Sequence, residues 1–199
     1  MALDIATIKR LKDLTGIGLT DAKRALEEAD GDFDKALEAM RKKGLTKADK
    51  RGEKEAREGL IGTYNHDGRI GVTVEINCET DFVARGEIFG ALIKDVAMHI
   101  AASSPQYVST DDIPAEEQER VKAEFAEKAA ADGKPADMIE KIIGGQIQKH
   151  FAERCLLEQP YIKNPDVTVG EYVKSQAALM NENVVVRRFA RLALGEIFN

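Results

Sequence analysis

The chain has 199 residues, of which 43% are hydrophobic and 32% are charged, a composition that suits one large folded domain or two unequal ones. Its net charge of −6 disfavours nucleic acid as a direct partner, because proteins that bind phosphates usually carry an excess of positive charge. Two cysteines are too few for a disulfide framework, and we find neither a secretory signal nor an apolar run of membrane length. We therefore expect a cytoplasmic protein that binds no membrane.

Residues 1–45 are expected to form a bundle of three short amphipathic helices. Apolar side chains recur at helical spacing in each of them: Ile5, Ile8, Leu11 and Leu14; Ala22, Ala25, Leu26 and Ala29; Phe33, Ala36, Leu37 and Met40. Asp4, Thr20 and Asp32 precede the three runs as candidate N-caps, while Gly31 and Gly44 follow the second and third. A bundle of this size is marginally stable alone.

Residues 46–58 carry almost no apolar side chain and alternate charges of both signs. This pattern is typical of a solvated helix or a linker, and we place the domain boundary there. The chain is thus divided into the bundle at 1–45, a charged linker at 46–58 and a core domain at 59–199.

The core domain begins with a change of hydrophobic period. From Ile70 to Cys78 every second residue is apolar, which predicts a half-buried strand, and Leu60–Tyr64 is its expected partner across an Asp67-Gly68 turn. Helices are predicted over 86–102, 115–132, 136–152 and from Thr168 to Met180, with a final strand from Val184 toward Leu194. The expected fold class is therefore α+β, with a small antiparallel sheet packed against helices.

Motifs for catalysis and cofactor binding are missing from the sequence. There is no phosphate-binding loop, and neither the cysteines nor the histidines have the spacing of metal ligands. His99 falls on the apolar side of its helix, which favours a packed or partner-facing histidine over a catalytic one. Cys78 and Cys155 continue apolar runs and are expected to be buried thiols. We expect no enzyme activity, no cofactor and no metal site.

The segment Asn77-Cys-Glu-Thr-Asp-Phe-Val-Ala-Arg85 joins the predicted strand to the next helix. Thr80 or Asp81 can cap that helix, and Phe82 can fold back onto the core. An aromatic ring beside a carboxylate at a loop tip also suits docking, because the ring supplies buried area and the carboxylate gives polar specificity. The residues alone leave both interpretations open.

This segment resembles the characteristic sequence of the elongation factor Ts family. Further stretches agree with that family and cover nearly the whole chain in order: Thr15–Leu26, Arg69–Val72 with Glu75–Cys78, and Leu157–Tyr161 with Asn183–Phe189. The resemblance implies a ubiquitin-associated-like three-helix bundle at the N-terminus, followed by an α+β core. The chain resembles the short form of the family, because it has room for one core unit, whereas longer members carry two copies.

The resemblance also implies a function and a partner. Members of the family are guanine-nucleotide exchange factors for elongation factor Tu, and they speed GDP release from this GTPase during translation elongation. By this resemblance, Thr80, Asp81, Phe82 and Val83 would enter the GDP-loaded GTPase and dislodge its Mg²⁺. Lys12, Leu19 and Thr20 of the bundle would add a second contact. Leu19-Thr20 departs from the family, which often has two methionines at these positions.

Self-association is expected as well, because a single core unit leaves a sheet face or edge exposed, and we predict a homodimer. Two rival functions remain at this stage. One is a scaffolding protein in which the bundle is fused to an unrelated core, and it predicts no effect on nucleotide release. The other is a small hydrolase that uses Cys78 and a histidine, and it predicts an exposed thiol of low pKa.

Overall fold

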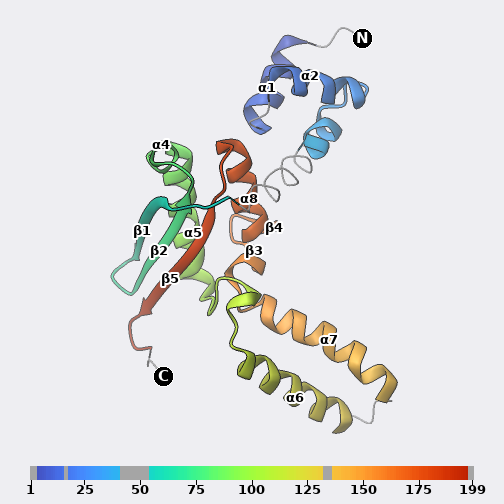
Figure 1. The fold of residues 1–199 in the computed structure, drawn as a ribbon, viewed down its shortest axis with the longest axis vertical. Helices are drawn as coiled ribbons and strands as arrows, with labels where there is room; N and C mark the ends of the chain where they lie inside the picture. Colours follow the sequence, from blue (N-terminus) through green and yellow to red (C-terminus); the bar gives the residue numbers. More distant parts are fainter. Residues whose placement is uncertain (1–3, 16–17, 41–53, 132–135, 197–199) are drawn as a thin grey trace.

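A computed structural model describes residues 4–15, 18–40, 54–131 and 136–196. It shows an N-terminal helical bundle, a central sheet with helices against it, and a long helical hairpin that projects from the centre (Figure 1). The α+β class predicted from the sequence is confirmed, with a three-helix bundle followed by a small antiparallel sheet packed against helices.

The bundle consists of α1 (Ile5–Thr15), α2 (Leu19–Glu28) and a third helix over 33–40. Its core gathers most of the apolar positions predicted from helical spacing, namely Ile8, Leu11, Ala22, Ala25, Leu26, Ala36 and Met40. Ile5 and Leu14 were expected on the same face, but they are 68% and 48% exposed. Both lie near an end of α1.

The helix starts agree with two of the three predicted caps. Oδ1 of Asp4 accepts a hydrogen bond from the Ala6 amide at 3.2 Å, and Oδ1 of Asp32 accepts one from the Lys35 amide at 3.1 Å. The cap predicted at Thr20 is wrong. Gly18 is the N-cap of α2, because its extended backbone lets its carbonyl accept from the Ala22 amide at 3.0 Å, which places Thr20 in the first turn. Gly44 lies outside the described residues.

The central sheet contains β1 (Glu58–His66), β2 (Ile70–Cys78) and β5 (Val185–Ala193), antiparallel in the order β1-β2-β5. Asp67, Gly68 and Arg69 join β1 to β2. The predicted Asp67-Gly68 turn has positive φ angles of 50° and 69°, and the Arg69 amide donates to the His66 carbonyl at 2.9 Å. The predicted strand pair is thus confirmed, and β1 extends beyond the predicted residues at both ends.

One face of the sheet carries the main core. Val72, Val74, Ile76 and Cys78 of β2 are buried in this core. Helix α5 (Glu87–Ser103) packs against β1 and β2, and α8 (Val169–Met180) packs against α5 and adds Val169, Val173 and Ala177 to the same core. Helix α5 approaches β1 so closely that a Cβ at Gly62 would lie 1.8 Å from the side chain of Ile93. The opposite face carries Ile61 and Leu192, which are 69% and 56% exposed, and no helix of the described residues covers it.

Helices α6 (Ala115–Ala131) and α7 (Ala136–Ala152) form the projecting hairpin between η1 (Thr110–Asp112) and η2 (Leu156–Glu158). A second short hairpin follows, made of β3 (Pro160–Tyr161) and β4 (Asn164–Thr168). This strand pair was not predicted from the sequence. The capping box predicted at Thr168 is confirmed, because the Thr168 amide donates to the Glu171 carboxylate and the Glu171 amide donates to the Thr168 hydroxyl oxygen.

Candidate functional site

The candidate site is the junction between the end of β2 and α4 (Asp81–Ala84), a helix of a single turn that precedes α5. Thr80 caps this helix, and its hydroxyl oxygen accepts a hydrogen bond from the Val83 amide at 3.4 Å. The cap expected at Thr80 or Asp81 therefore falls on Thr80. Asp81 occupies the first turn and pairs with Arg85 at 3.2 Å.

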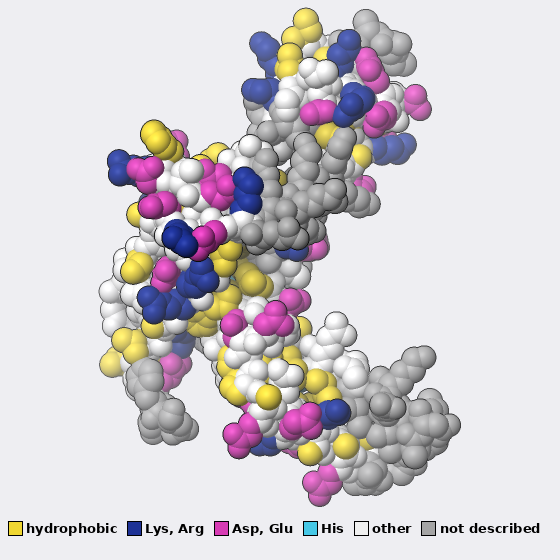
Figure 2. All heavy atoms as spheres, viewed as in Figure 1, with side chains coloured by type: hydrophobic (Ala, Val, Ile, Leu, Met, Phe, Trp, Pro, Cys, Tyr) yellow, Lys and Arg dark blue, Asp and Glu magenta, His cyan; other side chains and the backbone are white. Residues whose placement is uncertain are grey.

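Phe82 projects from the tip of the junction and is 86% exposed, more than any other large hydrophobic side chain in the described residues. Ile88, at the start of α5, is 43% exposed. Figure 2 shows hydrophobic atoms protruding at the position of α4, with acidic and basic side chains beside them. Val83 points the other way and packs against the main core. The interpretation in which Phe82 folds back onto the core is therefore wrong.

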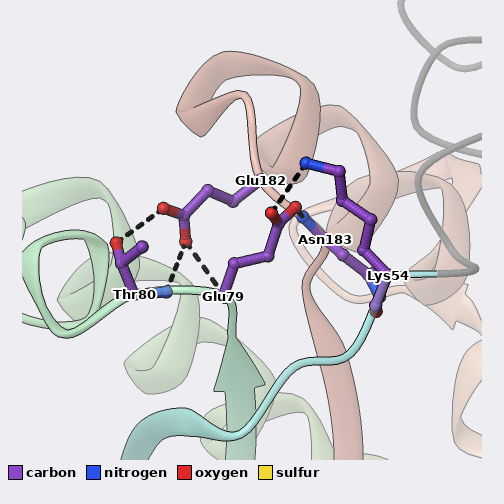
Figure 3. Close-up of polar contacts among 5 residues, drawn as sticks. All are labelled: Lys54, Glu79, Thr80, Glu182 and Asn183. Atoms are coloured by element: carbon purple, nitrogen blue, oxygen red, sulfur yellow. Dashed lines mark hydrogen bonds and ion pairs between the residues drawn. The ribbon is translucent and has the colours of Figure 1, made fainter.

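The backbone before α4 is held by Glu182, which comes from the loop between α8 and β5. Its Oε2 accepts hydrogen bonds from the amides of Glu79 and Thr80, each at 3.1 Å, and its Oε1 accepts one from the Thr80 hydroxyl at 2.6 Å (Figure 3). One carboxylate thus satisfies three donors at the point where β2 has ended. Because the two segments are more than 100 residues apart in the sequence, no local pattern could have indicated this contact.

Glu79 in turn binds the loop between α8 and β5. Its Oε1 accepts from the Asn183 amide at 2.7 Å, and its Oε2 pairs with Nζ of Lys54 at 2.9 Å (Figure 3). The Asn183 side chain in turn donates to the Lys54 carbonyl at 2.6 Å. We call Lys54, Glu79, Thr80, Glu182 and Asn183 the brace. It joins three segments: the entry to β1, the junction and the entry to β5.

Cys78 is the last residue of β2, next to the junction, and is fully buried. Burial raises the pKa of its thiol, and the nearby Glu182 carboxylate raises it further. A thiol in this setting is a poor nucleophile, since reactive cysteines need an exposed and electropositive environment. The burial predicted for both cysteines is confirmed, and the hydrolase interpretation, which required an exposed thiol of low pKa, is wrong.

Known proteins match this chain over almost its full length. The sequence model of the family described as elongation factor TS matches residues 21–196. The chain belongs to the elongation factor Ts family. It is 52% identical over 197 residues to elongation factor Ts of Geobacter sp. (strain M21), and the aligned region covers 98% of this chain and 91% of the relative. Elongation factor Ts of Carboxydothermus hydrogenoformans is 49% identical over 190 residues, 95% of this chain and 88% of the relative.

Membership of the elongation factor Ts family identifies the chain as a translation elongation factor. The bundle residues singled out by the family resemblance lie apart from the junction in the fold (Figure 1). Lys12 is in the last turn of α1, and Leu19 and Thr20 are in the first turn of α2. All three are exposed, Leu19 by 50%. They precede the part of the chain that the elongation factor Ts sequence model matches.

A second polar cluster lies further along α5, where Asp95 and His99 face the β3–β4 hairpin. Nε2 of His99 is 2.9 Å from Oε1 of Gln159, and Nδ1 accepts from the Ile162 amide at 3.3 Å. This pattern fixes a neutral ring protonated at Nε2. Burial lowers the pKa of His99, only partly offset by the contact with Gln159. The packed histidine predicted from the sequence is confirmed, because the ring is fully buried.

Within residues 4–15, 18–40, 54–131 and 136–196, no group of three or more histidine, cysteine, aspartate or glutamate side chains is arranged to hold a metal ion. In the same ranges, no helix has both the length and the apolar composition needed to cross a membrane.

Proposed function

We propose that this chain is a guanine-nucleotide exchange factor for elongation factor Tu, acting without covalent chemistry. It would bind the GDP-loaded GTPase, displace the Mg²⁺ held there and so accelerate GDP release. The observation that carries the proposal is the exposure of Phe82, at 86%, on a junction whose backbone is held in place, in a member of the elongation factor Ts family. An exposed aromatic ring on a fixed backbone is the kind of anchor that dominates protein interfaces.

The displacement of Mg²⁺ follows from how GTPases hold nucleotides. Backbone amides bind the phosphates, and Mg²⁺ bridges the phosphate oxygens in the GTPase. Mg²⁺ demands near-ideal octahedral geometry at short distances, so a small shift of its ligands removes much of its binding energy. In this proposal the Phe82 ring wedges between helices of the partner, and Asp81 fixes its approach by polar contacts. Val83 anchors the wedge to the core behind it.

The proposal has a thermodynamic consequence. A factor that speeds GDP release by this route binds the empty GTPase more tightly than the loaded one. By linkage, the nucleotide must weaken the binding of the factor by the same ratio. The bundle would add a second contact to the partner through Lys12, Leu19 and Thr20, which all lie exposed at neighbouring ends of α1 and α2.

Self-association is a second part of the proposal, and the open face of the sheet supports it. This face carries small side chains at Thr73 and Ala190, and the exposed apolar side chains of Ile61 and Leu192 flank them. An open sheet face of this kind can bury apolar area against a symmetric copy of itself. We expect light scattering to give the mass of a homodimer at micromolar concentration. A monomer, both alone and with the GTPase, would contradict this part.

The exchange proposal is tested with purified elongation factor Tu loaded with labelled GDP. With excess unlabelled GDP present to displace the factor from the empty GTPase, we expect this chain to accelerate release of the labelled GDP at amounts well below those of the GTPase, because each molecule then acts repeatedly. Chelation of Mg²⁺ provides the control for the mechanism. When the ion has already been removed, the additional acceleration by this chain should shrink. Unchanged release in the presence of this chain would overturn the proposal, and undiminished acceleration without Mg²⁺ would overturn the displacement step.

A further inference from the structure

The one-turn helix that carries Phe82 has few means of holding its own position. A single turn is unfavourable in isolation, because nucleation fixes several backbone angles for one hydrogen bond. Its cap is also long, since the Val83 amide lies 3.4 Å from the Thr80 hydroxyl oxygen. The tip therefore depends on contacts from outside the helix. The shortest of these is the 2.6 Å hydrogen bond from the Thr80 hydroxyl to Glu182.

We infer that Glu182 is a positioning residue for exchange: it presets the conformation in which the junction presents Phe82 to the partner. The inference rests on the exchange function proposed above. By accepting from the Glu79 and Thr80 amides, the Glu182 carboxylate fixes the two peptide units that precede α4. A tip fixed in advance loses less conformational entropy on binding, so a larger share of the contact energy appears as affinity.

The other half of the brace locates Glu182 itself. The backbone amide of the next residue, Asn183, donates to the Glu79 carboxylate at 2.7 Å. Each of the two loops therefore contributes a carboxylate that binds backbone amides of the other. Lys54 supplies a positive charge to this pair of carboxylates through its 2.9 Å contact with Glu79. Asn183 is 7% exposed, and Glu79 and Glu182 are partly buried, with their carboxylates turned toward the backbone of the other loop (Figure 3). Glu182 therefore acts through Thr80 and needs no contact with the partner.

The alternative is that Glu182 only stabilises the fold by closing the ends of β2 and β5. A double-mutant cycle separates the two roles, because residues that act through each other are not additive. The full chain is prepared with Glu182→Ala in the wild-type and Phe82→Ala backgrounds. Each protein is assayed for GDP release from elongation factor Tu and for unfolding in urea.

We expect Glu182→Ala to lower exchange efficiency roughly tenfold in the wild type, because the competent conformation becomes a minor population. In the Phe82→Ala background the same change should have little further effect on exchange, while its effect on unfolding should be the same in both backgrounds. An equal loss of exchange in the two backgrounds, or no loss in either, would overturn the inference. Normal exchange by Phe82→Ala alone would overturn the proposed function instead.

Two conservative variants keep the test decisive if Glu182→Ala fails to fold. Glu182→Gln retains an oxygen that can accept from both amides, so exchange should stay within about threefold of wild type. Glu182→Asp retains the charge but shortens the side chain by one methylene, so exchange should fall although the charge is unchanged. The opposite order would contradict a role through hydrogen-bond geometry. Glu171→Ala is the matched control, because Glu171 also accepts from a backbone amide, that of Thr168 at 2.8 Å, but at the start of α8. It should lower stability and leave exchange intact.

Discussion

Two regions along α5 use the same kinds of side chain in opposite ways. At the junction before α5, the Phe82 ring faces solvent, and the Glu182 carboxylate points inward to the backbone. Further along, Asp95 accepts hydrogen bonds from the hydroxyls of Tyr161 and Tyr172 at 2.9 and 2.8 Å. The two tyrosine rings stack with centroids 4.3 Å apart. Here the aromatic rings and the carboxylate hold each other inside the protein.

The difference between these regions indicates what each one is for. A buried aromatic ring contributes to folding through the area that it removes from water. Phe82 is 86% exposed, so its ring removes almost no area from water, although Glu182 holds the backbone just before it. Its apolar area is therefore available to a partner. The tyrosine cluster should accordingly govern stability, and the junction should govern exchange.

The largest expected effect comes from Phe89, which is fully buried seven residues after Phe82. Phe89→Ala should cost about 3–5 kcal/mol of unfolding free energy, because it leaves a cavity in the main core. The loss is measured by urea denaturation. Exchange per folded molecule should stay near the wild-type value. A Phe89→Ala protein of normal stability would show that the division between the two regions is wrong.

A smaller loss is expected for Tyr172→Phe, which keeps the stacked ring but removes a hydroxyl that donates to Asp95. Burial raises the pKa of Asp95, but the hydrogen bonds from Lys163, Tyr172 and Tyr161 outweigh it and hold that pKa below its ordinary value. Loss of one such donor to a carboxylate should cost about 1.5–3 kcal/mol of stability. Tyr161→Phe provides the matched comparison. If either variant reduced exchange at unchanged stability, the tyrosine cluster would belong to the docking surface.

The pH dependence of stability should sharpen the comparison further, with a smaller effect. The pKa of His99 lies below its ordinary value of 6.5 in the folded protein, chiefly because the ring is buried. The unfolded chain therefore binds a proton first as the pH falls. The contribution of neutral His99 is complete above about pH 6.5 and is lost as the pH falls from there through the folded pKa. Urea titrations between pH 8 and 5 measure it. A stability that rose over this range on acidification would contradict the assignment.

The smallest changes in stability are expected at the junction itself. Asp81 pairs with Arg85 on the surface, where the two side chains are 50% and 80% exposed. Asp81→Ala should change the unfolding free energy by less than about 1 kcal/mol, because exposed ion pairs contribute little. Exchange should fall, since the proposal assigns Asp81 a polar contact with the partner. A clear loss of stability with normal exchange would show that Asp81 serves only the helix start.

Local patterns in the sequence predicted most of the core domain. Alternation from Ile70 to Cys78, the Asp67-Gly68 turn and the capping box at Thr168 are each determined within a few residues, so they could be predicted without a structure. The β3–β4 hairpin escaped prediction because β3 has only two residues, too few for a period to be visible. The N-cap of α2 was misplaced because threonine and glycine are about equally favourable N-caps, so residue type alone could not decide between Thr20 and Gly18, whose extended backbone takes that position.

The candidate site was only half predictable. Thr80 and Phe82 could be singled out from the sequence, but an apolar residue after a strand can turn inward or outward, and only the fold shows that Phe82 turns outward. Glu182 could not be found, because its contacts join segments about 100 residues apart and depend on how β2 and β5 meet. Long-range polar contacts of this kind leave no periodic trace in a sequence.

Phe82→Ala, studied by GDP release and by thermal unfolding on the same preparation, is the most direct test of the account. Removal of an exposed anchor should lower exchange efficiency by about thirtyfold, which corresponds to about 2 kcal/mol at an interface hot spot. The unfolding free energy should stay within about 0.5 kcal/mol of wild type, as for other surface substitutions. Full exchange activity together with a lowered melting temperature would contradict the account, because the junction would then be structural and exchange would depend on another surface.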